Sequence, residues 1–129
     1  MEININDFTT NNIDPTGTSL RGHLIACYTD LILKLGEPTN DFDDSKSDAA
    51  WHIRWNDGVI ATIYNWKNGK NYRGSQGLKT EDILNWNIGG LTNGVEVDRL
   101  DQLFRSPLLG FKSPTTLNLH YVTWQRQTY

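Results

Sequence analysis

Residues 49–66 read AAWHIRWNDGVIATIYNW, and this stretch has the pattern of two antiparallel strands joined by a tight turn. Apolar and polar side chains alternate over residues 50–55, which is the period of a strand with one buried face. Asp57 and Gly58 follow, and this pair favours a hairpin because the tight turn needs positive φ angles. Residues 59–66 return with apolar side chains on both faces, so we expect a central strand with a partner on each side.

Outside this hairpin, hydrophobic spacing predicts two main helices and further short strands. The clearest helical stripe covers residues 19–35, with Thr18 or Ser19 as the N-cap and Gly36 at the stop. The later segments are a helical turn, a short strand, a second helix and a final strand, at residues 80–84, 86–88, 93–104 and 116–124. This order indicates an α+β fold, a small antiparallel sheet of three to five strands with two main helices packed on one face.

The composition indicates one cytoplasmic domain. The 129 residues fit a single domain over residues 1–129, in which residues 1–18 are a loosely ordered leader or an edge strand. Cys27 is the only cysteine, so no intramolecular disulfide can form and an intracellular protein is indicated. The first residues are polar and no apolar run approaches the ~18–20 residues of a membrane span, so we expect no signal peptide and no membrane association.

The charge is unevenly distributed along the chain. The formal net charge is −3, which disfavours a general nucleic-acid coating protein because such proteins are far more basic. Residues 66–80 nevertheless hold four basic residues and no acid. The other eight basic residues stand against fifteen acids, which leaves the rest of the chain at −7. A positive island on a negative molecule can attract an anionic ligand locally.

The most informative segment is residues 62–74, TIYNWKNGKNYRG, which combines rings, cations and amides around two glycines. Rings can stack on a base, cations can meet phosphates and amides can read base edges, so the segment suits a planar, anionic ligand. The alternative is a solvated loop whose rings complete the core. The candidate ligand- or partner-binding residues are Tyr64, Trp66, Lys67, Lys70, Asn71, Tyr72 and Arg73. The GxxxxGK[ST] spacing of a P-loop is absent.

No pattern in the sequence predicts a catalytic residue, a metal site or a cofactor. The three histidines, His23, His52 and His120, lack HxxxH and HExxH spacing. Cys27 lies on the apolar stripe of the first predicted helix, where we expect a buried, unreactive thiol. The acids of residues 41–44 lack the glycine and distal glutamate of an EF-hand, which favours a solvated loop.

Four segments resemble a group of small, uncharacterised accessory proteins of bacteriophages and prophages. They are SLRG at 19–22, LGEPT at 35–39, AAWHIRWNDGVIATIYNWKNGKNYRG at 49–74 and WNIGG at 86–90. The match from residue 19 to residue 90 covers a little over half of the chain, and the residues from Leu91 onward lie outside it. The resemblance implies little about activity, but it implies a phage-type origin, for which inhibition of host defences is a common role.

These observations lead to three hypotheses for function. The first is a non-enzymatic, anti-CRISPR-like counter-defence protein that binds a host effector in the bacterial cytoplasm, either through an acidic surface that mimics nucleic acid or through Trp anchors. The second is a sponge that sequesters a nucleotide second messenger through residues 64–73. The third is a small enzyme acting on a nucleotide or nucleic acid, with His52 and His120 as its acid and base. The expected partner is thus a host defence protein or an anionic nucleotide, and a homodimer is left open.

Overall fold

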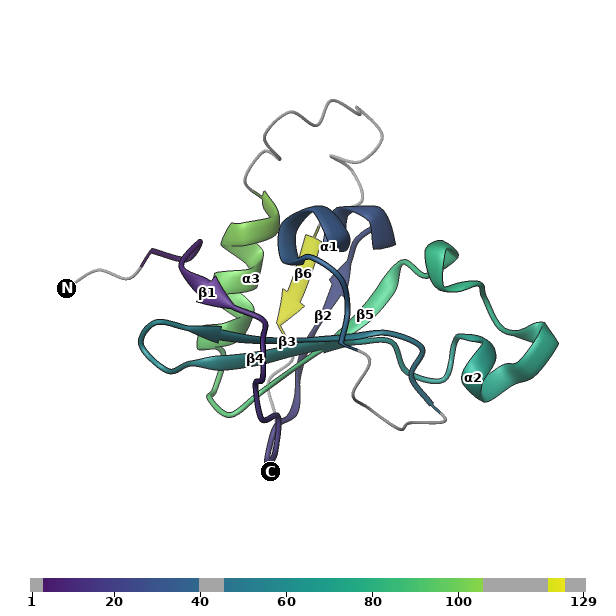
Figure 1. Ribbon diagram of the computed structural model, residues 1–129, viewed down its shortest axis with the longest axis horizontal. Coiled ribbons are helices and arrows are strands. Elements are labelled where there is room, and N and C mark those ends of the chain that lie inside the picture. The colour runs from purple at the N-terminus through teal and green to yellow at the C-terminus, as the bar shows by residue number, and fades with distance from the viewer. Residues whose placement is uncertain (1–3, 40–45, 106–120, 125–129) are drawn as a thin grey trace.

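The computed structural model describes residues 4–39, 46–105 and 121–124, and Figure 1 shows how their helices and strands are arranged. The strands and α-helices are, in chain order, β1 (Phe8–Thr9), β2 (Ser19–Ile25), α1 (Tyr28–Leu35), β3 (Ala50–Trp55), β4 (Ile60–Tyr64), α2 (Lys70–Arg73), β5 (Asn85–Gly90), α3 (Val95–Arg105) and β6 (Tyr121–Trp124). Two 3-10 turns, Gly74–Gln76 and Thr80–Asp82, lie between α2 and β5.

The strands form one antiparallel sheet in the order β1-β3-β4-β5-β2-β6. The five longer strands match the predicted size of the sheet, and the two-residue β1 extends its edge. Helices α1 and α3 lie on the same side of the sheet, whereas α2 projects beyond its end (Figure 1). The predicted α+β fold with two main helices on one face is therefore confirmed.

The hairpin of β3 and β4 has the predicted register. Trp51 pairs with Ile63, and Ile53 pairs with Ala61, so the apolar side chains of both strands share the helix-covered face. Gly58 closes the turn with a φ of 91°, a left-handed conformation in which glycine carries no steric penalty. Strand β4 also pairs with β5, which confirms that it is central in the sheet.

The first predicted helix is wrong in its N-terminal half. Residues Ser19–Ile25 form β2, which pairs with both β5 and β6, and the helix occupies only Tyr28–Leu35. Leu20 and Leu24 are four residues apart, a spacing that fits one face of a strand as well as one face of a helix. Pairing on both sides of β2 decides between the two, and local spacing does not contain that information.

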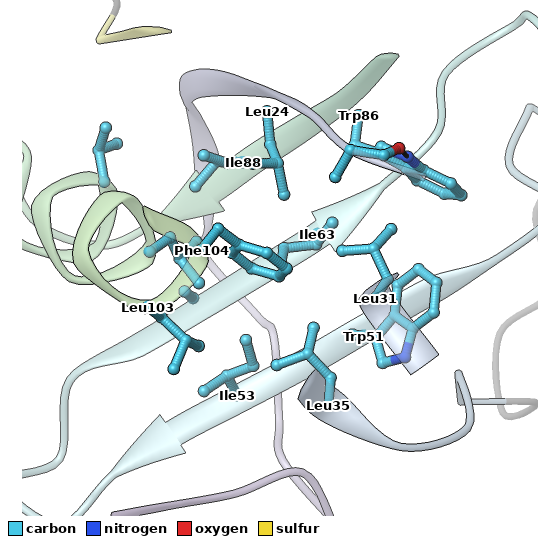
Figure 2. Close-up of a cluster of buried hydrophobic side chains, with 14 of the residues drawn as sticks. Leu24, Leu31, Leu35, Trp51, Ile53, Ile63, Trp86, Ile88, Leu103 and Phe104 are labelled. Carbon is cyan, nitrogen blue, oxygen red and sulfur yellow. Dashed lines mark hydrogen bonds between the residues drawn. The ribbon is translucent and has the colours of Figure 1, made fainter. Parts of the chain in front are cut away.

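The core lies between the sheet and the two main helices (Figure 2). Trp51 and Trp86 pack edge to face with ring centroids 5.4 Å apart, beside Leu31 from α1 and Phe104 from α3. Three indole N–H groups donate to backbone carbonyls, so these rings are buried without an unsatisfied donor: Trp51 to Gly36 at 2.9 Å, Trp55 to Ile5 at 2.9 Å and Trp86 to Ala26 at 3.0 Å.

Most of the remaining sequence predictions can be compared with the structure, and a few fall on residues outside the described ranges. The helical turn near residue 80, the strand at residues 85–90 and the second helix agree with the structure. The last predicted strand agrees over Tyr121–Trp124, and residues 116–120 lie outside the described residues. His120 and the acids of residues 41–44 also lie outside them.

Candidate functional site

The side of the sheet opposite α1 and α3 carries polar side chains. Because successive side chains of a strand point to opposite faces, His52 and Thr62 project away from the core, and these two residues are register partners. Tyr64 projects to the same side beside Ala50, its own register partner. The chain between β1 and β2 descends on this side of the sheet (Figure 1). This face is therefore partly walled by the N-terminal segment.

A pocket of about 250 Å³ lies on this face, and we refer to it as the sheet-face pocket. Its lining comes from the N-terminal segment, from the chain entering β3, and from β3, β4 and the residues just after β4: Pro15, Thr18, Ser47, Ala50, His52, Thr62, Tyr64 and Trp66. The lining therefore combines two aromatic rings with hydroxyl groups and an imidazole.

Gly89 keeps the neighbouring part of this face open. It is the register partner of Thr62 on β5, and a Cβ there would lie 2.4 Å from the Thr62 Oγ1 and 3.6 Å from the Tyr64 ring. A side chain on this residue would therefore push into Thr62 and fill the space beside Tyr64. Glycine is required here because the Thr62 side chain lies too close to the backbone of residue 89 for a Cβ.

The loop after β4 is held by the buried side chain of Asn65. Its Oδ1 accepts hydrogen bonds from the backbone N–H groups of Asp48, at 2.7 Å, and Ala49, at 3.0 Å. Its Nδ2 donates to the Asp48 carboxylate, at 2.9 Å, and to the Asn68 side chain, at 3.0 Å. The Asn65 side chain is fully buried, the bond from Ala49 is buried and the other three are partly buried, so the network is largely shielded from water.

The Asp48 carboxylate extends this network to α2. Its Oδ2 accepts from the backbone N–H of Asn71 at 3.1 Å, in the first turn of α2. The Asn71 side chain donates to the Ser47 carbonyl at 2.8 Å. The amides of Asn65 and Asn71 are thus engaged within the protein, whereas the sequence interpretation had assigned such amides to reading a ligand. Asn71 positions α2.

Rings and cations gather at this loop, four of them exposed and two, Lys46 and Lys67, partly exposed, and we call them the aromatic–cation surface: Lys46, Trp66, Lys67, Lys70, Tyr72 and Arg73. Trp66 is 43% exposed and Tyr72 is 51% exposed. The Lys67 ammonium lies 5.8 Å from the centroid of Trp66 and 5.3 Å from that of Tyr72. The Lys46 ammonium lies 5.3 Å from the centroid of Trp66. These distances are those of cation–π contacts.

The backbone turns sharply at the centre of this surface. Lys67 has a φ of 62°, a left-handed conformation that is uncommon for a residue with a side chain. Its carbonyl accepts a hydrogen bond from the Arg73 Nε at 2.8 Å, which ties the end of α2 back to the turn. Lys70 and Arg73 are both exposed. The turn therefore brings the Arg73 side chain back to Lys67, whose ammonium contacts both rings.

Tyr64 joins the sheet-face pocket to the aromatic–cation surface. It is half-buried, lines the pocket, and packs edge to face on Trp66 with ring centroids 6.2 Å apart. Trp66 belongs to both regions. Of the seven candidate binding residues named from the sequence, Tyr64 and Trp66 line the pocket, and so does His52, which the enzyme hypothesis named.

Two titratable groups favour their neutral forms, one in the sheet-face pocket and one at the N-cap of α1. Burial lowers the pKa of His52, and a hydrogen bond with the Ile13 backbone acts in the opposite direction. Cys27 is partly exposed at the N-cap of α1, whereas the sequence predicted a buried thiol within a helix. Burial raises the pKa of this thiol, and the Asp30 carboxylate raises it further.

The sequence interpretation did not assign several contributors to this region. Lys46 and Asp48 lie far from the loop in sequence and meet it through the pairing of β3 with β4. By contrast, strand alternation alone places His52 and Thr62 on the face opposite Trp51, and the structure confirms this placement. The pocket wall made by Pro15 has no signal in the sequence, because it depends on where the N-terminal segment crosses the sheet.

Comparisons and searches of the described residues add three findings. No group of three or more His, Cys, Asp or Glu side chains in residues 4–39, 46–105 and 121–124 is arranged to hold a metal ion. No helix among those described residues has the length and apolar character needed to cross a bilayer. No protein-family model, curated protein or solved structure matches this chain.

Proposed function

We propose that this chain is a non-enzymatic, phage-type counter-defence protein that inhibits a host immune system by binding a host effector. The aromatic–cation surface is the docking site in this proposal, and the bacterial cytoplasm is where it acts. The observation that carries the proposal is the exposure of Trp66 and Tyr72 among cations on a loop that is held by hydrogen bonds of the buried Asn65 side chain.

The composition of this surface supports binding to a protein. Trp, Tyr and Arg dominate the residues that contribute most to the affinity of protein interfaces. Trp66, Tyr72 and Arg73 are all exposed at or beside α2, which projects beyond the end of the sheet (Figure 1). A projecting loop can enter a concave site, and its cations favour a partner site with acidic residues at the rim.

The rigidity of the loop also supports this proposal. Ordering a flexible segment costs free energy at the moment of binding, typically about 0.5–1.5 kcal/mol for each immobilised side chain. Here the Asn65 and Asp48 network holds the backbone of α2 before any partner arrives. The surface is therefore prepared for binding with a smaller entropic cost.

The test combines an infection assay with a binding assay. Bacteria with an active CRISPR system are infected with a phage that the system targets, with and without expression of this chain. The wild-type chain should restore plaque formation only in cells whose immunity is active, and the purified chain should form a complex of fixed stoichiometry with the purified effector. Trp66→Ala combined with Tyr72→Ala should abolish both effects.

The matched control is Leu33→Ala, which removes an exposed apolar side chain from α1 on the other face of the sheet. It should behave as wild type. Full protection by the Trp66 and Tyr72 double variant would refute docking through this surface. A lack of protection by the folded wild-type chain against every immune system tested would refute the counter-defence role.

A further inference from the structure

We infer that the sheet-face pocket is a separate ligand site, which takes a single nucleobase whose phosphate lies toward Lys46 and Lys67. This inference does not depend on effector docking, because most of the pocket comes from β3, β4 and the N-terminal segment. It also differs from a nucleotide cradle built by the loop alone, since it leaves Lys70, Tyr72 and Arg73 out of the ligand contacts.

The size of the pocket selects one base. Pockets for drug-sized ligands usually enclose about 300–1,000 Å³. The sheet-face pocket, at about 250 Å³, falls just below that range. It suits one heterocyclic ring and part of its sugar, and it is too small to enclose two nucleotides. A cyclic dinucleotide would be at most half enclosed.

The lining supplies the groups that bind a base. The rings of Tyr64 and Trp66 are nearly perpendicular, at 82°, so a base entering the pocket meets the face of one ring and the edge of the other. Contacts between bases and aromatic rings tolerate any base because every base has a π face. Hydroxyl groups of Thr18 and Thr62 can both donate and accept hydrogen bonds at the base edge.

The charge on the two sides of the pocket is asymmetric. Burial lowers the pKa of His52, which therefore lines the pocket as a neutral imidazole that can donate or accept a hydrogen bond. At Trp66, by contrast, the ammonium groups of Lys46 and Lys67 lie 5.3 Å and 5.8 Å from the ring centroid. A base that contacts Trp66 therefore places an attached phosphate near two cations on an otherwise acidic protein.

One ligand chemistry here has two sources, a free mononucleotide or a base of a single-stranded nucleic acid. The experiment titrates the folded protein with AMP, adenosine, inorganic phosphate and a short single-stranded oligodeoxyadenylate, using calorimetry and tryptophan fluorescence. AMP should bind about tenfold more tightly than adenosine, because only AMP offers a charge to the two lysines. Inorganic phosphate alone should bind far more weakly than AMP. Binding of the oligonucleotide but not of AMP would support the site and identify the nucleic acid as the source.

Two sets of variants locate the ligand. Thr62→Val keeps the shape of the side chain and removes the hydroxyl, and Lys46→Ala with Lys67→Ala removes both cations; each change should weaken AMP binding about tenfold. Gly89→Ala would press a Cβ against Thr62 beside the pocket and should weaken AMP binding, and a wild-type circular dichroism spectrum is required before its result is used. Lys79→Ala is the matched control, because it removes an exposed cation that lies outside both regions, and it should leave AMP binding unchanged.

Three results would overturn the inference. They are the absence of binding of both AMP and the oligonucleotide at millimolar concentration, AMP binding that survives Thr62→Val and the double lysine change, and AMP binding that is lost in Lys70→Ala, which changes an exposed cation of α2 outside the proposed contacts. The last result would instead support nucleotide binding by the loop at residues 64–73. Thr62→Val should still bind the effector, because it leaves the aromatic–cation surface intact. A variant that loses AMP binding but keeps effector binding therefore separates this inference from the proposed function.

Discussion

Replacing Asn65 with alanine tests the network that holds the loop. The change removes the acceptor for the N–H groups of Asp48 and Ala49, which are 2.7 Å and 3.0 Å from Asn65 Oδ1. A buried donor left without a partner costs about 1–3 kcal/mol. Because Ala49 is buried and Asp48 is partly buried, the sum for the two groups is about 2–5 kcal/mol.

This loss is large beside the stability of a small domain, which is typically about 5–15 kcal/mol. For a chain of this length, 1 kcal/mol corresponds to about 4 °C in Tm, so Asn65→Ala should lower Tm by roughly 8–20 °C. Urea unfolding gives the free energy directly. Amide exchange should show faster exchange of the Asn71 and Arg73 N–H groups, which bond to Asp48 Oδ2 and the Gly69 carbonyl.

Two variants calibrate this measurement. Asn68→Ala removes one acceptor of the same network and should cost about 1 kcal/mol. Asn93→Ala changes an exposed asparagine outside the network and should stay within about 0.5 kcal/mol of wild type. A loss below about 1 kcal/mol for Asn65→Ala, with unchanged exchange in α2, would refute the assignment of Asn65 as the residue that holds the loop.

Three further predictions concern the rest of the fold. The pKa of Asp57 is lowered from 3.8 to about 2, mainly by its hydrogen bonds with Arg99, so the pair stabilises the fold fully above about pH 4 and this stabilisation is lost as the pH falls through about 2. Asp57→Asn should therefore flatten that part of an acid-unfolding curve followed by circular dichroism, and an unchanged curve would contradict the pairing. Gly90→Ala would place a Cβ 2.4 Å from the Cδ of buried Glu96, so Tm should fall by several degrees in a thermal melt, and an unaltered Tm would argue against this packing. Because the pKa of the Cys27 thiol is raised, its alkylation by iodoacetamide near neutral pH should be slower than that of a cysteine in an unfolded peptide, and equal rates would contradict the burial.

The predictions that held for the fold depend on local sequence. The hairpin was predictable because the Asp57-Gly58 turn and the alternation before it lie within a few residues. The strand β2 was not, because the spacing of Leu20 and Leu24 fits two structures and only pairing with β5 and β6 separates them. Local patterns thus predict strands that pair with the next segment of the chain, as in a hairpin. They are ambiguous for strands whose pairing partners come much later in the chain.

The candidate site shows the same division between local and distant information. The exposure of Trp66 and Tyr72 agrees with the expectation of rings displayed beside cations. The engagement of Asn71 by Ser47 was not predictable, since it depends on how the chain before β3 meets the loop after β4. Residue types could suggest a surface of rings and cations. They could not separate the side chains that are exposed to a partner from those that hold the loop through hydrogen bonds within the protein.

The contrast among the tryptophans argues that Trp66 is not a misplaced core residue. Trp51 and Trp86 are essentially fully buried, and each indole N–H has a carbonyl partner. Trp66 follows the end of β4 and is 43% exposed beside two lysines. Cation–π contacts at exposed sites contribute about 0.5–1 kcal/mol each, which is small beside the ~2 kcal/mol or more that a central tryptophan contributes at an interface. These cation–π contacts are therefore weaker than what the exposed ring can contribute on binding a ligand or partner, which is the property that a binding surface needs.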